Sequence, residues 1–142
     1  MSTLMQADPG EKSLLRLLKS LTATLHPTTY VFATLKEEDL PPLADIVMFF
    51  REQENATIIT SLDYAEQNSI VYFFPCRMIT LNVTSSLEAV GFLAVIASKL
   101  AQQNLGVNPV SAFFHDHLFI PLGREHDAME ILAEVAREQK GQ

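Results

Sequence analysis

Residues 78–103 read MITLNVTSSLEAVGFLAVIASKLAQQ, and the spacing of their apolar side chains changes partway along. Over residues 78–83 apolar and polar positions alternate, which is typical of a strand with one buried face. Ser85 and Glu88 have the spacing of a helix capping box. We therefore predict a helix over residues 86–103, and because most of its length is apolar on nearly every side, more than one of its faces should be covered.

The rest of the C-terminal half predicts a hairpin and a second helix. Strands are expected at 107–114 and 118–121, joined by a tight connection at His115-Asp116. Gly123 precedes a final amphipathic helix. Its inner stripe consists of Ala128, Ile131, Leu132 and Val135. The order in this half is thus β-α-β-β-α, one strand short of a ferredoxin-like unit with two helices on one sheet face.

The N-terminal half is predicted to begin with a helix and to continue mainly as strands. Asp8 to Glu11 carries a capping signature, and the leucine stripe that follows ends at His26-Pro27. The stripe consists of Leu14, Leu18, Leu21 and Leu25. Strands are expected at residues 30–34, 46–50, 57–60 and 70–74, with a loop at 36–42 and a short helix from Asp63 to Asn68.

The two halves are expected to complete each other, because one lacks a strand and the other has a surplus. The predicted fold class is α+β and ferredoxin-like: two βαββα-type units sharing a core, with antiparallel sheets and helices on one face. The expected boundary separates an N-terminal unit, residues 1–75, from a C-terminal unit, residues 76–142. Open sheet edges favour pairing of two copies across a two-fold axis, so we expect a homodimer.

Composition and charge narrow the classes of function. The chain has 142 residues, of which 48% are hydrophobic, enough for a full-size core. Its net charge of -7 and its scattered basic residues argue against nucleic acid and anionic membranes as partners. The single cysteine, Cys76, suits a buried position in a reducing compartment. Without a signal peptide or an apolar run of ~20 residues, we expect a cytoplasmic protein.

Motifs that carry enzyme chemistry are missing from the sequence. The five glycines stand too far apart for a phosphate-binding loop, and no Gly-x-Ser-x-Gly or Cys-x-x-Cys motif occurs. We therefore expect no cofactor, no metal and no catalytic residue. His115, Asp116 and His117 resemble a metal cluster, but such a site needs a further ligand, and only His126 is nearby in sequence. Arg51 is interpreted as part of a solvated turn, with binding of a ligand carboxylate as the alternative.

Several stretches of the second half resemble an ACT domain. They are residues 85–94, Leu100-Ala101, Gly106-Val107-Asn108 and the hairpin at 115–121. In the first half, Leu25-His26-Pro27 followed by Tyr30-Val31-Phe32 fits the same family. Over nearly its whole length the chain is similar to small bacterial proteins made of two ACT-like units in tandem.

The resemblance implies a non-catalytic regulatory module that binds a small metabolite, most commonly an amino acid, at an interface. In the family the ligand lies near the loop between the first strand and the first helix, which corresponds here to Thr84, Ser85 and Ser86, with Asn82 just before them. A helix N-terminus with free N–H groups suits a ligand carboxylate. Gly91 lies a turn inside the predicted helix, where it would let another element pack closely.

Two other interpretations stay open. The apolar run from Leu87 to Ala97 favours a structural module that self-associates or docks on an enzyme without any ligand. The remaining one is a small metal-dependent enzyme with His115, Asp116 and His117 at its centre.

Overall fold

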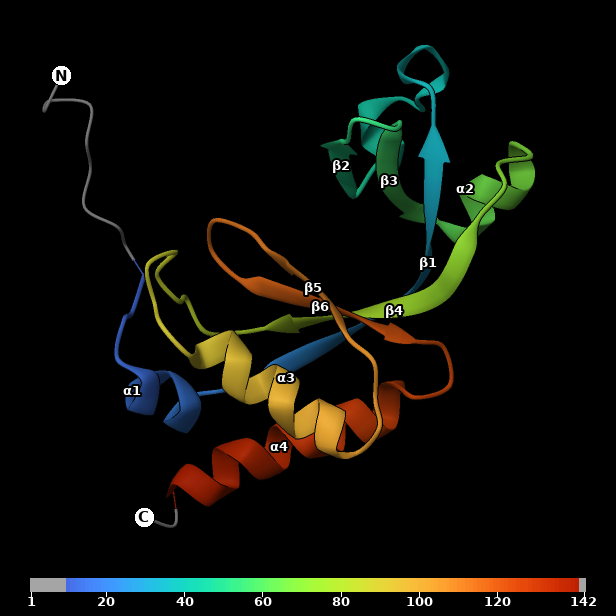
Figure 1. Cartoon of the computed structure of the whole chain (residues 1–142). Helices are drawn as coiled ribbons and strands as arrows, with labels where there is room; N and C mark the ends of the chain where they lie inside the picture. The colour runs from blue at the N-terminus through green and yellow to red at the C-terminus, as the bar shows by residue number, and fades with distance from the viewer. Residues whose placement is uncertain (1–9, 141–142) are drawn as a thin grey trace, which may run out of the picture.

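The computed structural model describes residues 10–140, and it is a curled sheet with helices packed beneath it (Figure 1). The helices are α1 (Leu14–Lys19), α2 (Leu62–Gln67), α3 (Phe92–Gln102) and α4 (Glu125–Lys140), with 3-10 turns η2 (Glu37–Asp39) and η3 (Leu43–Asp45). The strands are β1 (Ala23–Leu35), β2 (Met48–Arg51), β3 (Ala56–Ser61), β4 (Phe73–Leu81), β5 (Asn108–Ser111) and β6 (Asp116–Pro121). Within the described range no helix has the length and apolar character needed to cross a membrane.

All six strands form one sheet, in the order β2-β3-β1-β4-β6-β5, and every neighbouring pair is antiparallel. The central strands β1 and β4 are the longest, with 13 and 9 residues. Their pairing shifts register between Leu25 and Thr29 and again between Tyr30 and Phe32. Irregularities of this kind bend a strand and increase its twist. The sheet therefore curls, and its β2–β3 end turns away from the layer of helices (Figure 1).

The two long strands belong to both units of the fold. The C-terminal half runs β4-α3-β5-β6-α4, and β1 supplies its missing fourth strand beside β4. The N-terminal half runs β1-β2-β3-α2, and β4 supplies its fourth strand beside β1. The α+β, ferredoxin-like class is thus confirmed, as is the expectation that the halves complete each other in one continuous sheet.

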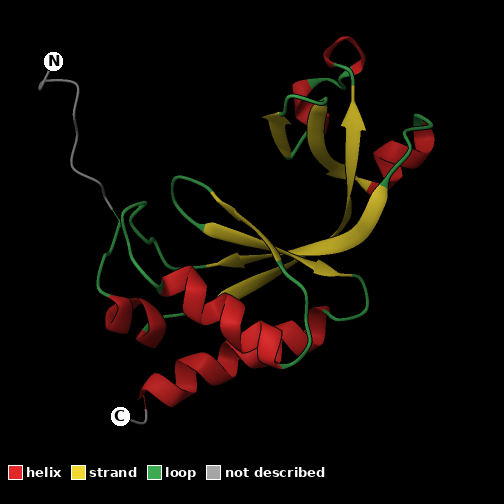
Figure 2. Cartoon of the chain, viewed as in Figure 1, coloured by secondary structure: helices red, strands yellow, loops and turns green. Residues whose placement is uncertain are grey.

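The principal core lies between the C-terminal half of the sheet and the helices α1, α3 and α4 (Figure 2). Ile79 of β4, with Leu118 and Ile120 of β6, clusters with Ile96 of α3 and Leu132 of α4, and none of them is more than 2% exposed. Full burial of one such side chain contributes about 1.5–3 kcal/mol. This cluster is therefore the main source of stability of the fold.

A smaller apolar cluster occupies the opposite face, where the sheet curls. Ile59, Cys76 and Phe119 are buried there. The rings of Tyr30 and Phe32 meet the Phe119 ring edge-on, with centroids 6.2 and 5.8 Å away. Burial raises the pKa of the Cys76 thiol to about 12. The cysteine therefore serves as an unreactive packing residue, as the sequence predicted.

The first helix ends earlier than predicted. The leucine stripe was expected to stay helical to Leu25, whereas α1 ends at Lys19 and strand β1 begins at Ala23. Pro27 therefore lies inside a strand instead of ending a helix. The strand tolerates it because the pairing of β1 with β4 is irregular between Leu25 and Thr29, where a proline removes no regular ladder bond.

Two helix caps also differ from prediction. Asp8, expected to cap the first helix, lies outside the described residues. Ser13 caps α1, because its hydroxyl accepts a hydrogen bond from a backbone N–H of the first turn. In the same way Ser61 caps α2, which begins at Leu62 and not at Asp63 as predicted.

The observed strand bounds differ from the predicted ones near prolines and aromatic residues. The strands predicted at 70–74 and 78–83 are one strand, β4, because the proline between them does not interrupt the sheet. The strand predicted at 107–114 stops at residue 111, and residues 112–115 make the turn. Asp116 is not a turn residue but the first residue of β6, held to β5 by a hydrogen bond from a serine hydroxyl.

Candidate functional site

The loop between β4 and α3, residues 82–91, is the centre of the predicted site and is longer than predicted. The capping box of Ser85 and Glu88 is wrong, because α3 begins at Phe92. Instead, the Ser86 hydroxyl accepts a hydrogen bond from the N–H of Glu88 in a local turn, and the Ser85 hydroxyl donates to a carboxylate of β6. Local bonds of this kind compete with helix formation, which explains the late start of α3.

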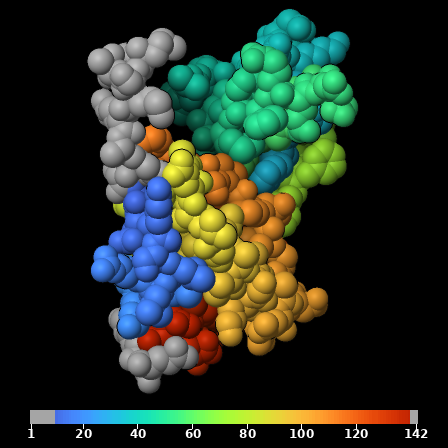
Figure 3. Space-filling view, turned by 60° about the vertical axis from the view of Figure 1, so that its left-hand side comes forward, coloured from blue at the N-terminus to red at the C-terminus, as the bar shows by residue number. Residues whose placement is uncertain are grey.

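A short N-terminal segment holds this loop in place (Figure 3). The N–H of Glu11 donates to the carbonyl of Thr84 at 2.7 Å, and the carbonyl of Glu11 accepts from the N–H of Ser86 at 3.0 Å. A side chain at Gly10 would place its Cβ 2.3 Å from the Ser86 nitrogen, so only glycine fits there. The N–H of Ser86 is therefore already used within the chain.

A hollow of about 190 Å³ opens beside the loop, between the start of α3 and the β5–β6 hairpin. Its polar wall consists of Ser85, Ser86, Ser111 and Asp116, and its apolar wall consists of Leu87, Ala89, Phe92, Leu93 and Ala112. Ser85 and Ser86, which the sequence assigned to the site, are thus brought together in one wall. The volume equals that of about six water molecules and suits a small metabolite.

Asp116 is the charged residue of this hollow, and from the sequence it was expected only as a turn residue or as part of a metal cluster. Its carboxylate is 7% exposed and accepts hydrogen bonds from the hydroxyls of Ser111, at 2.5 Å, and Ser85, at 3.3 Å. None of the ion pairs among residues 10–140 includes Asp116. Its neighbours in the sequence suggest a turn, and only the pairing of β5 with β6 carries it to the loop.

The N-terminus of α3 forms another side of the hollow. Gly91 was predicted inside this helix, but it is the N-cap residue, with φ of 90°. Residues that carry a side chain rarely adopt that backbone conformation, so glycine suits this position. No side chain caps the helix, and Phe92 and Leu93 of its first turn line the hollow. The positive end of the helix dipole therefore lies beside the hollow and favours a negative group there.

The other two predicted site residues lie elsewhere. Thr84 and Asn82 line a larger hollow of about 530 Å³, next to α1. The amide of Asn82 donates a hydrogen bond to the hydroxyl of Thr24 at 2.8 Å, across to β1. The structure therefore separates Thr84 and Asn82 from the hollow that Ser85 and Ser86 share.

His115, Asp116 and His117 do not converge on one point. Asp116 faces the hollow, whereas the ring of His117 lies on the other sheet face, with Nδ1 2.9 Å from Thr80 Oγ1. The Nδ1 atom of His115 lies 3.1 Å from the carbonyl of Val83. In residues 10–140 no three His, Cys, Asp or Glu side chains are placed to share a metal ion. This geometry does not favour the metal-dependent enzyme.

A chain of hydrogen bonds, which the sequence did not predict, crosses the sheet face opposite α3 and α4. Thr80 Oγ1 lies 2.7 Å from His26 Nε2 as well as 2.9 Å from His117 Nδ1. Burial lowers the pKa of His117, and the nearby charges of His115 and His26 lower it further, while Asp116 acts in the opposite direction. The chain exists because β4 lies between β1 and β6 in the sheet.

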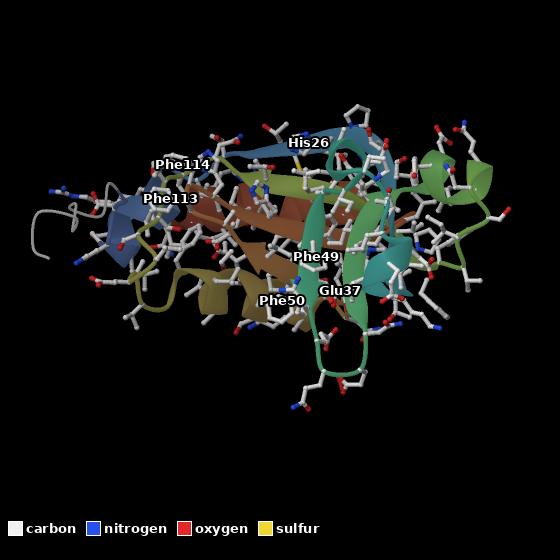
Figure 4. All side chains as sticks on the ribbon, turned by 90° about the horizontal axis from the view of Figure 1, so that it is seen from above. His26, Glu37, Phe49, Phe50, Phe113 and Phe114 are labelled. Carbon is white, nitrogen blue, oxygen red and sulfur yellow. The ribbon has the colours of Figure 1, made fainter. Side chains whose placement is uncertain are left out.

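Arg51 has partners of its own in the N-terminal unit. Its guanidinium pairs with Glu37 and lies 5.3 Å from the centre of the Phe49 ring. Glu37, Phe49 and Phe50 are labelled on this unit in Figure 4. Because Arg51 is already neutralised in an acidic neighbourhood, the geometry favours the solvated-turn interpretation over carboxylate binding.

Exposed apolar side chains stand next to the hollow. Leu87 and Val90 of the loop are 61% and 84% exposed, and Phe113 and Phe114 of the hairpin turn are 56% and 60% exposed. The two phenylalanine rings contact each other edge to face, with centroids 4.9 Å apart, and lie side by side in Figure 4. Apolar groups gathered beside a hollow are typical of an interaction site.

Comparison with known protein families gives two matches. Residues 9–77 match one model of the ACT domain, and residues 74–134 match a second. The two matches meet in β4, one of the two strands that both units use. Among curated proteins, none matches the chain.

Solved structures resemble most of the chain. A Vibrio cholerae protein of unknown function, described as a possible transport protein, is 33% identical with a TM-score of 0.75, and the match covers 88% of this chain and 97% of that one. An Agrobacterium tumefaciens protein is 18% identical, with a TM-score of 0.68 and coverage of 82% and 89%. The regulatory subunit of aspartate kinase from Thermus thermophilus is 9% identical, with a TM-score of 0.60 and coverage of 80% and 95%. The last two show the fold alone.

The fold is a tandem of two ferredoxin-like units that share their central strands. The matches of both halves, together with the Vibrio cholerae structure, show that the chain belongs to the ACT-domain family. The resemblance seen in the sequence is thus confirmed. ACT domains are generally regulatory, ligand-binding modules and are typically non-catalytic.

Proposed function

We propose that this protein is a non-catalytic regulatory module that binds an amino acid in the hollow beside residues 84–86. The observation that carries the proposal is the hollow itself, because it lies at the loop between the first strand and first helix of the C-terminal unit. It combines serine hydroxyls, one carboxylate and an uncapped helix N-terminus, and these groups suit the polar ends of an amino acid.

The four residues of the candidate site have different parts in this proposal. Ser85 and Ser86 contact the ligand directly, since they line the hollow. Thr84 holds the loop through its backbone bond with Glu11, and Asn82 fixes the start of the loop through Thr24. A direct ligand contact from Thr84 or Asn82 would require the loop to move.

Regulation follows from the connection between the loop and the rest of the chain. The loop pairs through its backbone with Glu11, which leads directly into α1. A ligand that binds one arrangement of loop and segment more tightly than another shifts the population toward that arrangement. The proposed output is thus a change in the N-terminal segment or in a partner bound nearby.

The protein is proposed to act as a homodimer. The edge strands β2 and β5 are four residues each, and no strand of residues 10–140 covers their outer sides. The exposed side chains of Leu87, Val90, Phe113 and Phe114 would be buried if a second copy covered the mouth of the hollow. Within each copy, the proposed units are residues 1–75 and 76–142, with their boundary inside β4.

A second candidate function is self-association or enzyme docking without a ligand. The observation that favours it is the same group of exposed apolar side chains beside the hollow. In that case the serines only shape the loop, and the hollow stays filled with water.

A thermal-shift screen separates the two candidates. The purified protein is mixed with each of the twenty amino acids at millimolar concentration. A ligand present at ~100 times its dissociation constant adds about 2.7 kcal/mol, which raises the melting temperature by about 5–10 °C. Ser85→Ala should abolish a selective shift, whereas Ser98→Ala, at an exposed serine of α3, should preserve it. A flat screen with a dimeric mass in light scattering would favour the second candidate.

A further inference from the structure

Asp116 gives the proposed ligand site a charge that no ion pair of residues 10–140 balances. Its carboxylate is buried, and the ion pairs of residues 10–140 leave it without a cationic partner. A carboxylate has about four acceptor positions, and hydroxyls of Ser85 and Ser111 occupy two of them. Buried charges are normally paired, so a cationic group bound in the hollow would be stabilised by Asp116.

We propose that Asp116 binds the ammonium group of the ligand, and that the ligand is a small α-amino acid with an apolar side chain. This inference rests on the proposed function and names the class of amino acid. The ammonium group would pair with the Asp116 carboxylate and donate hydrogen bonds to its remaining lone pairs. Ser85 and Ser111, which already donate to that carboxylate, hold it in one orientation.

The opposite charge of the ligand is matched at the start of α3. The first turn of this helix lines the hollow and has no capping side chain. Its N–H groups therefore suit a carboxylate, while Asp116 suits an ammonium group. A zwitterion satisfies both sides at once, whereas a simple carboxylic acid leaves Asp116 unpaired.

The remaining wall sets the size and polarity of the ligand side chain. Leu87, Ala89 and Leu93 supply apolar surface, and Asp116 is the charged residue of the lining. A second ligand carboxylate, as in the acidic amino acids, would meet no cation and would face Asp116. The volume of about 190 Å³ also favours a small side chain. Small apolar amino acids therefore fit best.

The test is isothermal titration calorimetry with alanine and valine as probes. Propionate, which is alanine without its ammonium group, is the matched control ligand. Asp116→Asn keeps the shape of the side chain and removes its charge, and Asp39→Asn changes an exposed aspartate of η2 in the same way. We expect alanine or valine to bind, propionate to bind at least about tenfold more weakly, and Asp116→Asn to lose at least about tenfold in affinity while Asp39→Asn loses none.

Each result decides between the two proposals. If an amino acid binds but Asp116→Asn or propionate retains full affinity, the ammonium site is overturned and the proposed function stands. If an acidic or basic amino acid binds and alanine and valine do not, the proposed ligand class is overturned. If no amino acid binds to the parent protein at millimolar concentration, the proposed function fails as well. Because Asp116→Asn could unfold, the comparison of alanine with propionate on the parent protein decides independently.

Discussion

The two units of this protein share the same strand arrangement but differ in what connects the first strand to the second. In the C-terminal unit the connection is a long loop and the helix α3, with the hollow between them. In the N-terminal unit it is the pair of 3-10 turns η2 and η3, which bury none of their residues. The N-terminal unit therefore has no α-helix N-terminus at the equivalent place. The fold alone thus does not create a ligand site.

The surroundings of the two connections differ in charge as well. A hollow of about 290 Å³ in the N-terminal unit is lined largely by charged and polar residues, among them Glu37, Glu38 and Arg51. Arg51 is already paired with Glu37 there. In the C-terminal unit the carboxylate of Asp116 has no such partner in the described residues. We infer that the C-terminal unit binds the ligand and holds the principal core, while the N-terminal unit supplies the strand β1 that completes its sheet.

Removing packing from α3 should have the largest effect on stability. Ile96 is fully buried in the principal core, so Ile96→Ala should lower the free energy of unfolding by about 2–5 kcal/mol. Leu43→Ala is the counterpart in η3, where the side chain is 83% exposed, and should change it by less than about 0.5 kcal/mol. Urea denaturation measures both. Equal costs would show that the two connections contribute alike.

Replacing the glycine before α3 should have the next largest effect. Gly91 and Gly123 have φ of 90° and 97°, and neither position is crowded, so alanine is disfavoured by conformation alone. Each substitution should cost about 1–2 kcal/mol. Only Gly91→Ala should also weaken amino-acid binding, because Gly91 sets the direction of the first turn of α3.

The control in this pair is Gly123→Ala, which precedes α4 and is not part of the hollow. Calorimetric titration of both variants, each checked for a folded state by circular dichroism, separates stability from binding. If both glycine variants lose affinity equally, the loss reflects general destabilisation and not the geometry of the helix start.

The chain of hydrogen bonds through His26, Thr80 and His117 should make the free energy of unfolding depend on pH. Burial and the neighbours His115 and His26 lower the pKa of His117, while Asp116 opposes this. The unfolded chain, in which histidine titrates at about 6.5, therefore binds a proton at higher pH than the folded chain does. The free energy of unfolding should be highest above about pH 6.5 and fall as pH decreases through the lower pKa of the folded state.

Urea unfolding between pH 7.5 and about pH 5 measures this dependence. His117→Asn should reduce the slope, since its side chain does not titrate. His126→Asn, at an exposed histidine of α4, is the matched control and shows how much any histidine substitution changes the slope. An identical slope in His117→Asn would assign the dependence to other groups.

The sequence predicted the architecture better than the site. Alternation in β4 and the count of strands in each half sufficed to predict the shared sheet, because both depend on local pattern. Asp116 and His26 were missed as functional neighbours, because the contacts of Asp116 with Ser85 and of His26 with Thr80 exist only after the strands pair. The capping box failed for a related reason, since the backbone pairing of Glu11 with the loop competes with helix formation.

Disrupting the charged contacts of the N-terminal unit should have the smallest effect. Arg51 and Glu37 form an exposed ion pair, and Arg51→Ala should change the free energy of unfolding by at most about 0.5 kcal/mol. Arg77→Ala is the counterpart in β4, where the side chain is largely buried, pairs with Glu125 at 3.6 Å and donates to the carbonyl of His26 at 3.0 Å. Its cost should be clearly larger, because a buried carboxylate and a carbonyl lose their donor.

Ligand binding gives the Arg51→Ala variant a second use. Arg51→Ala should leave the affinity for alanine or valine unchanged, because the proposed site lies in the other unit. Calorimetric titration of the variant against the parent protein measures this directly. A loss of affinity in Arg51→Ala would mean that the N-terminal unit takes part in binding. The inference that only the C-terminal unit binds ligand would then be wrong.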